Sequence, residues 1–333
     1  MNLGLAIGIL TLALCIGCSE KKDTSAKTQK HTDSYSEVAD FNGDSAYRHI
    51  AAQVEMGPRV PGSDAHSECR QYIENMLRHY GADTVISQTF TTKAFTGDML
   101  TLTNITGKIN NKADRRILLA AHWDTRPWAE HDSNSDARQR PIPGANDGGS
   151  GVGVLLELAR VLKSAPADIG IDLVFFDGED YGNSSTWGNS DETWCLGSQY
   201  WADNNSYTEA TRPAYGIVLD MVGGKNAKFH REVSSNVNAP EIVDKVWDIA
   251  RRSGKGGTFV NSLGGNIIDD HLQLNRAGIP SIVIIESNNP RTRSFNPTWH
   301  TQSDDLSNID RKSLKNVGQT ILNLIYEESA RNN

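Results

Sequence analysis

The sequence is poor in several features, and each shortage excludes a class of protein. Only two of its four cysteines lie beyond residue 40, and they form no CxxC pair, which argues against thiolate zinc ribbons and thioredoxin-like chemistry. Lysine and arginine number 33 against 41 acidic residues and form no cluster, whereas nucleic-acid binding rests on clustered positive charge. No internal repeat is present. These exclusions leave a globular enzyme or a binding domain without a nucleic-acid partner.

The first 40 residues differ in composition from the rest. Leu3–Ile16 is an apolar run too short to span a bilayer, but of the length of a signal-peptide core. It leads into Gly17-Cys18-Ser19, which resembles the lipobox of bacterial lipoproteins. We therefore expect residues 1–17 to be a lipoprotein signal peptide and Cys18 to carry the lipid. Cleavage to a free periplasmic protein is the alternative.

Residues 18–40 contain almost no large apolar side chains, so they cannot bury enough surface to fold and are predicted to be a flexible tether. The protein is expected at a bacterial membrane, in the periplasm or cell envelope, touching the lipid only through its anchor. Residues 41–333 are then expected to form a single domain.

Strand and helix patterns alternate through residues 41–333. Four short, apolar, mostly β-branched runs are typical of strands covered on both faces: Ile117–Ala121, Ile171–Phe176, Tyr215–Leu219 and Ser281–Ile285. Two runs with polar alternation predict half-exposed, antiparallel strands: Thr84–Phe90 and Met99–Ile105. Seven segments have helical spacing: 46–56, 67–80, 152–162, 197–203, 242–252, 270–277 and 314–327. The pattern predicts an α/β three-layer sandwich, with a mixed, mostly parallel sheet flanked by helices.

Acids and histidines follow the predicted buried strands and a glycine-rich turn. Ligands of open α/β sheets bind beyond the carboxyl ends of the strands, so these residues are candidates for one site. They are His122, Asp147, Glu179, Asp180, Asp220, Asp269 and His300. Nitrogen and oxygen donors without thiolates suit zinc or another borderline divalent ion.

Each candidate also has an ordinary structural interpretation. His122 could be a hydrogen-bonded core histidine, and Asp147 could cap a helix. Glu179 and Asp180 could form a solvated acidic turn, and Asp220 and His300 could lie in ordinary turns and loops. Because all of them fall at strand ends or a glycine-rich turn, a shared site is the better interpretation.

The ordered motifs HWD, GANDGGSG, FFDGED, VLDMVGG, DDH and WH resemble the zinc aminopeptidase superfamily, and within it the animal-type glutaminyl cyclases and their bacterial relatives. The resemblance implies one zinc ion per chain, bound by Asp147, Asp180 and His300. Asp180 departs from the animal enzymes, which carry glutamate at that position.

The resemblance also implies how the other candidates act. Glu179 would shuttle a proton while the α-amine of an N-terminal glutamine attacks its own γ-amide, which yields pyroglutamate and ammonia. Asp220 and Asp269 would hydrogen-bond around Glu179 and the substrate, and Trp299 would line the glutamine pocket. The partners expected are peptides or proteins with N-terminal glutamine, and the enzyme is expected to be a monomer.

The same residues are compatible with two other functions. A zinc aminopeptidase would add His122 and Asp220 as ligands of a second metal ion, with Asp147 bridging both ions. A non-catalytic binding lipoprotein would keep the fold but lose the base or a ligand, and none of these is missing. Cys69 and Cys195 could form a disulfide or stay buried thiols.

Overall fold

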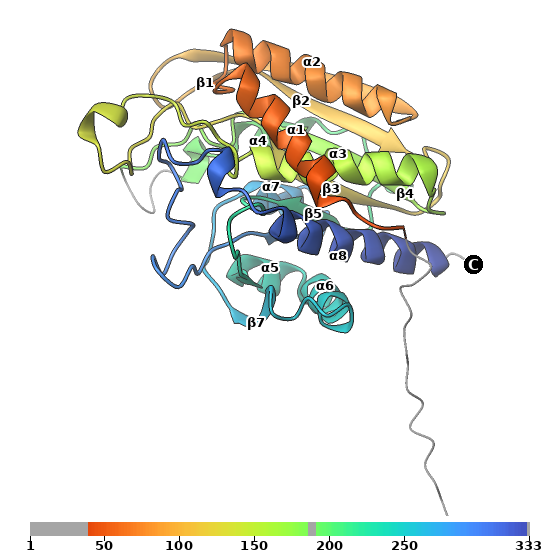
Figure 1. Cartoon of the computed structure of the whole chain (residues 1–333). Helices are drawn as coiled ribbons and strands as arrows, with labels where there is room; N and C mark the ends of the chain where they lie inside the picture. The colour runs from red at the N-terminus through yellow and green to blue at the C-terminus, as the bar shows by residue number, and fades with distance from the viewer. Residues whose placement is uncertain (1–38, 186–190, 332–333) are drawn as a thin grey trace, which may run out of the picture. The chain divides into compact units, whose positions relative to one another are not determined.

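The computed structural model describes residues 39–185 and 191–331 (Figure 1). They belong to one compact unit, which spans Tyr35–Asn333. The predicted signal peptide, Cys18 and nearly all of the predicted tether lie outside the described residues, so the division of the chain at residue 41 stays a prediction. Within the described ranges, no helix is long and apolar enough to cross a membrane.

A six-stranded mixed sheet lies at the centre of this unit. Its strands are, in spatial order, β1 (Thr84–Lys93), β2 (Met99–Ile109), β4 (Gly170–Phe176), β3 (Arg116–His122), β5 (Gly216–Leu219) and β8 (Ser281–Ile284). The four strands from β4 to β8 run parallel, whereas β2 is antiparallel to both β1 and β4. The parallel strands therefore end at the same edge, where ligands of such sheets bind.

Helices cover both faces of the sheet, which makes three layers (Figure 1). One face carries α1 (Gly43–Met56), α2 (Asp64–His79), α3 (Gly149–Ser164), α6 (Pro240–Arg252) and α8 (Arg311–Ala330). The other carries α4 (Leu196–Asn204) and α7 (Asp270–Arg276). The predicted fold class is confirmed.

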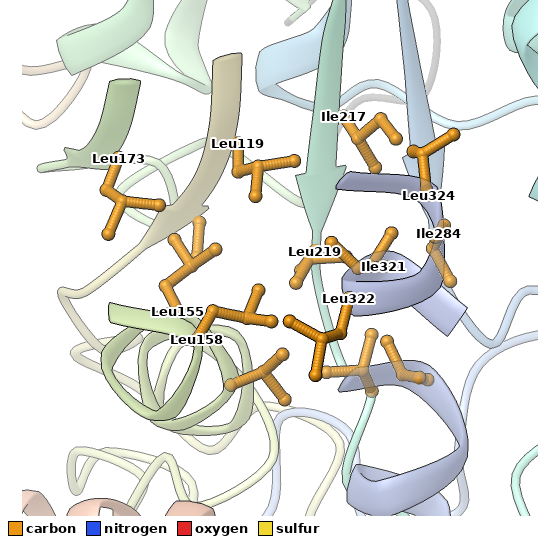
Figure 2. Close-up of a cluster of buried hydrophobic side chains, with 14 of the residues drawn as sticks. Leu119, Leu155, Leu158, Leu173, Ile217, Leu219, Ile284, Ile321, Leu322 and Leu324 are labelled. Atoms are coloured by element: carbon orange, nitrogen blue, oxygen red, sulfur yellow. The ribbon is translucent and has the colours of Figure 1, made fainter. Parts of the chain in front are cut away.

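Alternating side chains of the strands explain how the sheet is covered. Leu119 and Leu219 face the larger core, where they meet Leu155 of α3 and Leu322 of α8 (Figure 2). The intervening residues, such as Val218, face the smaller core. Burying one such side chain contributes about 1.5–3 kcal/mol to folding. Because successive side chains of a strand point to opposite faces, both cores hold the strands in register, and the residues at the strand ends are left to form the site.

The predicted elements are found with small shifts of their ends. The antiparallel strands β1 and β2 are longer than predicted, because they pair with each other over almost their whole length. The short elements that were not predicted include α5 (Val233–Asn238), β6 (Phe229–Arg231) and β7 (Phe259–Leu263). They contain too few residues to show a periodic pattern. Cys69 and Cys195 are both buried free thiols.

Candidate metal centre

Three of the predicted site segments emerge from neighbouring parallel strands. His122 is the last residue of β3, Glu179 and Asp180 follow β4, and Asp220 follows β5. The turn after β4 is sharp because Gly178 has a φ of 67°, a left-handed conformation that glycine adopts without strain. Strand ends that lie side by side thus bring these four side chains to one point.

Asp147 reaches the same point from the turn before α3. Gly148 has a φ of 77°, and a Cβ atom there would lie 2.6 Å from the Asp124 carbonyl oxygen, so only glycine fits. Asp304 fixes the turn by accepting the backbone N–H groups of Asn146 and Asp147 at 2.9 and 3.0 Å. Asp304 has no signal in the sequence pattern, because it lies 157 positions from Asp147.

Asp147, Asp180 and His300 form a group of three potential metal ligands, whose donor atoms lie within 4.8 Å of one another. His300 Nε2 lies 3.1 Å from Asp180 Oδ1 and 3.7 Å from Asp147 Oδ2. Asp147 Oδ2 and Asp180 Oδ2 are buried without a hydrogen-bond partner in the described structure. Two facing carboxylates with free buried oxygens need a cation between them, and this donor set fits zinc.

A second group shares Asp147. His122 Nε2 lies 3.1 Å from Asp147 Oδ1 and 3.2 Å from Asp220 Oδ1. The donor atoms of these three residues also lie within 4.8 Å of one another, close enough to bind one metal ion. On the far side of the ring, His122 Nδ1 lies 3.4 Å from Asp124 Oδ1. The structure therefore brings together the residues expected for one metal ion and those expected for a second.

Glu130 and Arg126 hold His300 in place, and the sequence analysis missed both. His300 Nδ1 lies 3.0 Å from Glu130 Oε1, and Arg126 donates to the Glu130 carboxylate from Nη2 at 2.7 Å. Burial works to raise the pKa of Glu130, but His300 and Arg126 outweigh it and hold the pKa well below its usual range. Arg126 Nη1 also donates to the Asp180 carbonyl oxygen at 2.8 Å. Carboxylate–histidine pairs of this kind orient metal ligands.

Glu179 lies beside the candidate metal ligands in a protected position. Its backbone N–H donates to Asp124 Oδ1 at 3.1 Å, and its Oε1 accepts from Cys195 Sγ at 3.4 Å. Burial, reinforced by the charges of Asp180, Asp270 and Asp269, raises the pKa of Glu179 well above its usual value, although His122 opposes this. A carboxyl with a raised pKa can carry a proton near neutral pH.

Asp269 is placed differently from what was expected of a substrate-binding residue. It precedes α7 and caps it by accepting the Asp270 backbone N–H, and its other oxygen is buried without a hydrogen-bond partner in the described structure. It does not belong to the described wall of the cleft. Its role toward the substrate stays a prediction, whereas its charge acts on Glu179 from behind.

A cleft of about 340 Å³ opens over this centre. Glu179, Asp180, Asp220 and His300 lie in its wall, as does Trp299, as expected. The Trp299 ring stacks on the His300 imidazole, with 3.9 Å between ring centroids. A second indole, Trp194, and apolar residues after β7 complete the wall. The arrangement combines buried acids with an aromatic-lined cleft whose volume lies in the range of small-molecule binding sites.

Comparisons with known proteins relate the chain to zinc peptidases and glutaminyl cyclases. The model of peptidase family M28 matches residues 104–325. The chain is 31% identical over 239 residues to aminopeptidase YwaD of Bacillus subtilis, covering 71% of this chain but only 46% of that relative. It is 26% identical to the glutaminyl-peptide cyclotransferase of Bos taurus, covering 81% of this chain and 78% of the relative.

A solved structure is more similar. The glutaminyl cyclase of Bacteroides thetaiotaomicron, crystallised with N-acetylhistamine, is 45% identical, with a TM-score of 0.83. The alignment covers 87% of this chain and 99% of that enzyme. The likeness therefore extends over nearly the whole length of that enzyme.

Proposed function

The chain belongs to peptidase family M28, and from this premise we propose that it is a zinc-dependent glutaminyl cyclase. It converts the N-terminal glutamine of peptides or proteins to pyroglutamate and releases ammonia. The observation that carries the proposal is the 45% identity, over 99% of its length, to a glutaminyl cyclase. A solved structure described as a leucine aminopeptidase precursor of the same organism is 44% identical, so identity alone does not separate the two activities. The curated relatives favour the cyclase, because the match covers 78% of the bovine glutaminyl-peptide cyclotransferase but only 46% of aminopeptidase YwaD.

Asp147, Asp180 and His300 would hold one zinc ion per chain in the proposed site. When bound, it supplies a Lewis acid that polarises the γ-amide carbonyl of the substrate. The shorter arm of Asp180, where the animal enzymes have glutamate, is accommodated because the Asp180 carboxylate already lies 3.1 Å from His300 Nε2.

Glu179 moves the proton. The α-amine of a peptide has an ordinary pKa of about 7.7–8.0, so at neutral pH much of it is protonated and must lose a proton before it attacks. Glu179 takes this proton as the bond between the α-nitrogen and the δ-carbon forms. It returns a proton to the amide nitrogen as the bond between that nitrogen and the δ-carbon breaks, and ammonia leaves. No water enters the reaction.

The surrounding acids and indoles prepare this transfer. Asp269 and Asp270 raise the pKa of Glu179, which brings the carboxyl closer to the pKa of the amine and makes exchange in both directions easier. Asp220 lines the same cleft as Glu179, and its carboxylate lies 3.2 Å from His122 Nε2; its part in hydrogen bonding around Glu179 stays a prediction. Trp299 and Trp194 line the cleft and hold the side chain bent, so that ring closure gains from proximity.

A metal-quantified preparation tests the proposal with two dipeptides, one glutaminyl and one leucyl. We expect ammonia and a cyclised product from the first and no free leucine from the second. Glu179→Gln is expected to lower kcat by about 10²–10⁴-fold with unchanged zinc content, whereas the control Glu209→Gln, an exposed acid, retains wild-type activity. A chelator should abolish the cyclisation.

The aminopeptidase remains a second candidate because the His122, Asp147 and Asp220 group is present. Free leucine together with about two metal ions per chain would establish it and reject the cyclase. Release of neither ammonia nor leucine would favour a binding protein instead.

We further propose that Cys18 anchors the enzyme to a membrane of the bacterial envelope and that the enzyme is a monomer. The support for the anchor is the apolar segment Leu3–Ile16 followed by Gly17 and Cys18. Cys18→Ser should move the protein from the membrane fraction to the soluble fraction without changing its activity. Light scattering of the soluble form should give the mass of one chain, and a dimer mass would refute the second point.

A further inference from the structure

The cleft contains one positive side chain whose role the proposed reaction does not explain. Among the described residues that line the cleft, Arg293 is the one lysine or arginine, and it faces a wall that includes Asp147, Glu179, Asp180 and Asp220. The side chain is exposed. A cation near an acidic centre normally pairs with the nearest carboxylate.

Arg293 has no such pair. Its guanidinium makes no ion pair or hydrogen bond with any described residue. Arg126 shows the contrast, because its guanidinium is fully engaged by Glu130 and by the carbonyl oxygens of Asp180 and Gly182. The five N–H donors of Arg293 therefore remain available to a ligand in the cleft.

The loop that carries Arg293 is clamped at both ends. Glu286, which follows β8, is fully buried. One of its oxygens accepts from Asn289 Nδ2 at 3.0 Å, and the other accepts from Asn296 Nδ2 at 2.9 Å. A single buried carboxylate thus fixes the two ends of the segment 289–296 relative to the sheet.

Hydrogen bonds within the loop hold its tip. Arg293 N–H donates to the Asn289 carbonyl oxygen at 2.8 Å, and Asn289 N–H donates to the Ser294 carbonyl oxygen at 2.8 Å. Arg293 itself has a φ of 60°, which is uncommon for a residue that is not glycine. The backbone therefore presents the side chain from a fixed base, so binding a ligand orders the side chain of Arg293 but not its loop.

We propose that Arg293 is a specificity residue that binds a carboxylate of the substrate beyond its N-terminal glutamine. The inference rests on the proposed cyclase function, which places the glutamine at the acidic centre and directs the rest of the peptide along the cleft wall. The carboxylate belongs to an acidic side chain at the second or third position, or to the C-terminus of a short peptide. Guanidinium and carboxylate form paired hydrogen bonds with little adjustment.

Four tripeptides distinguish these sources: a neutral glutaminyl-alanyl-alanine amide, the amides with glutamate at position two or at position three, and the neutral peptide with a free C-terminus. The measured quantity is kcat/KM for each acidic peptide divided by that for the neutral amide. We expect this ratio to fall about two- to fivefold in Arg293→Gln for at least one peptide, the range of exposed ion pairs. The change should appear in KM and diminish with added salt.

Arg291→Gln is the matched control, since Arg291 is exposed on the same loop but does not line the cleft; it should leave all ratios unchanged. Arg293→Glu should invert the preference toward a lysine at the same position. Unchanged ratios in Arg293→Gln, or an equal fall in Arg291→Gln, would overturn the inference. If no peptide is cyclised, the proposed function fails, and calorimetric binding of the same peptides still decides whether Arg293 selects a carboxylate.

Discussion

At the scale of single residues, Glu179 depends on a neighbour whose chemistry differs from its own. Cys195 is 1% exposed, and its backbone N–H donates to the Glu179 carbonyl oxygen at 2.9 Å while its thiol reaches Oε1. Burial, followed by the charge of Glu179, raises the pKa of this thiol well above its usual value. The thiol therefore stays protonated and donates a hydrogen bond that fixes one rotamer of the carboxyl.

Cys195→Ala is predicted to lower kcat about two- to tenfold, the equivalent of one modest hydrogen bond, with little change in KM. Cys195→Ser should restore most of the rate because the hydroxyl can donate in the same direction. Cys69→Ala, the other buried free thiol, is the control and should keep the wild-type kcat. Steady-state kinetics, with melting temperatures to confirm folding, decide this, and a wild-type kcat for Cys195→Ala would contradict it.

At the scale of elements, buried polar groups join segments that are distant in sequence. Arg59, between α1 and α2, is fully buried and donates to the carbonyl oxygens of Trp123, Pro143 and Gly144 at 3.3, 2.6 and 2.7 Å. It connects the residue after β3 to the turn that carries Asp147. Both metal groups share Asp147, so this arginine supports the centre without touching it.

Arg59→Met is expected to cost at least about 3 kcal/mol of the free energy of unfolding, because three carbonyl oxygens lose a charged donor in a buried place. Zinc affinity should fall as well, since the turn loses its support. Arg48→Met, at an exposed position of α1, should change stability by less than about 0.5 kcal/mol. Denaturant titration and competition with a zinc dye measure the two effects; equal stabilities of the two variants would count against this role.

The contact between α1 and α2 contains a histidine that must stay neutral. His49 Nδ1 lies 2.7 Å from the Tyr72 hydroxyl, and Nε2 lies 3.2 Å from the Tyr80 hydroxyl. Burial lowers the pKa of His49 from 6.5 to about 4, although Glu157 opposes it. The unfolded chain therefore binds a proton between about pH 6.5 and 4 that the folded chain does not, so stability falls as the pH falls through this window.

Between pH 7.5 and 5, His49 alone should cost about 2 kcal/mol of the free energy of unfolding, at 1.36 kcal/mol for each pH unit below 6.5. His49→Gln keeps a donor and an acceptor but cannot titrate, so its stability should fall less over the same interval. Urea unfolding at the two pH values measures the difference. Identical losses for both proteins would show that His49 does not titrate in this way.

Strands and site residues can be predicted from the sequence where the residues that mark them are close together in the chain. The buried runs that become β3, β4, β5 and β8 are visible because strands covered on both faces are apolar throughout. His122, Asp180 and Asp220 follow from them, since they stand at or just after the ends of these runs, whereas Asp147 is indicated by the glycine-rich turn before α3. Asp304 and Arg59 escape sequence reasoning because each meets its partners only through contacts between segments that are distant in the chain. Glu130 has a partner four positions away, Arg126, but its link to His300 spans 170 positions.

At the scale of the whole molecule, the buried carboxylates of Asp147 and Asp180 repel each other, and a bound metal ion would remove this repulsion. Burial and the charge of Asp147 raise the pKa of Asp180 from 3.8 to about 6. A raised pKa means that the metal-free fold is stabilised below about pH 4 and loses this contribution as the pH rises through 6. At pH 7.5 the metal-free fold has therefore lost this contribution to its free energy of unfolding.

Removal of zinc with a chelator at pH 7.5 is predicted to lower the melting temperature by roughly 5 °C or more, since a ligand at a hundred times its Kd contributes about 2.7 kcal/mol. Asp180→Asn should lose this response and, without metal, melt at or above the temperature of the metal-free wild type. Calorimetric scans with and without added zinc test both points. A chelator-resistant melting temperature in the wild type would argue against a zinc centre.

The separation of the candidate ligands along the chain also bears on the order in which the protein is made. Asp147 lies before α3 and Asp180 just after β4. His300 follows Asp147 by 153 positions and comes after β8, the last strand of the sheet in the sequence. A growing polypeptide exposes the two carboxylates long before the imidazole exists, and two acids alone hold zinc poorly. Loading of the ion is therefore a late event, and the cell must keep zinc available wherever synthesis and folding end.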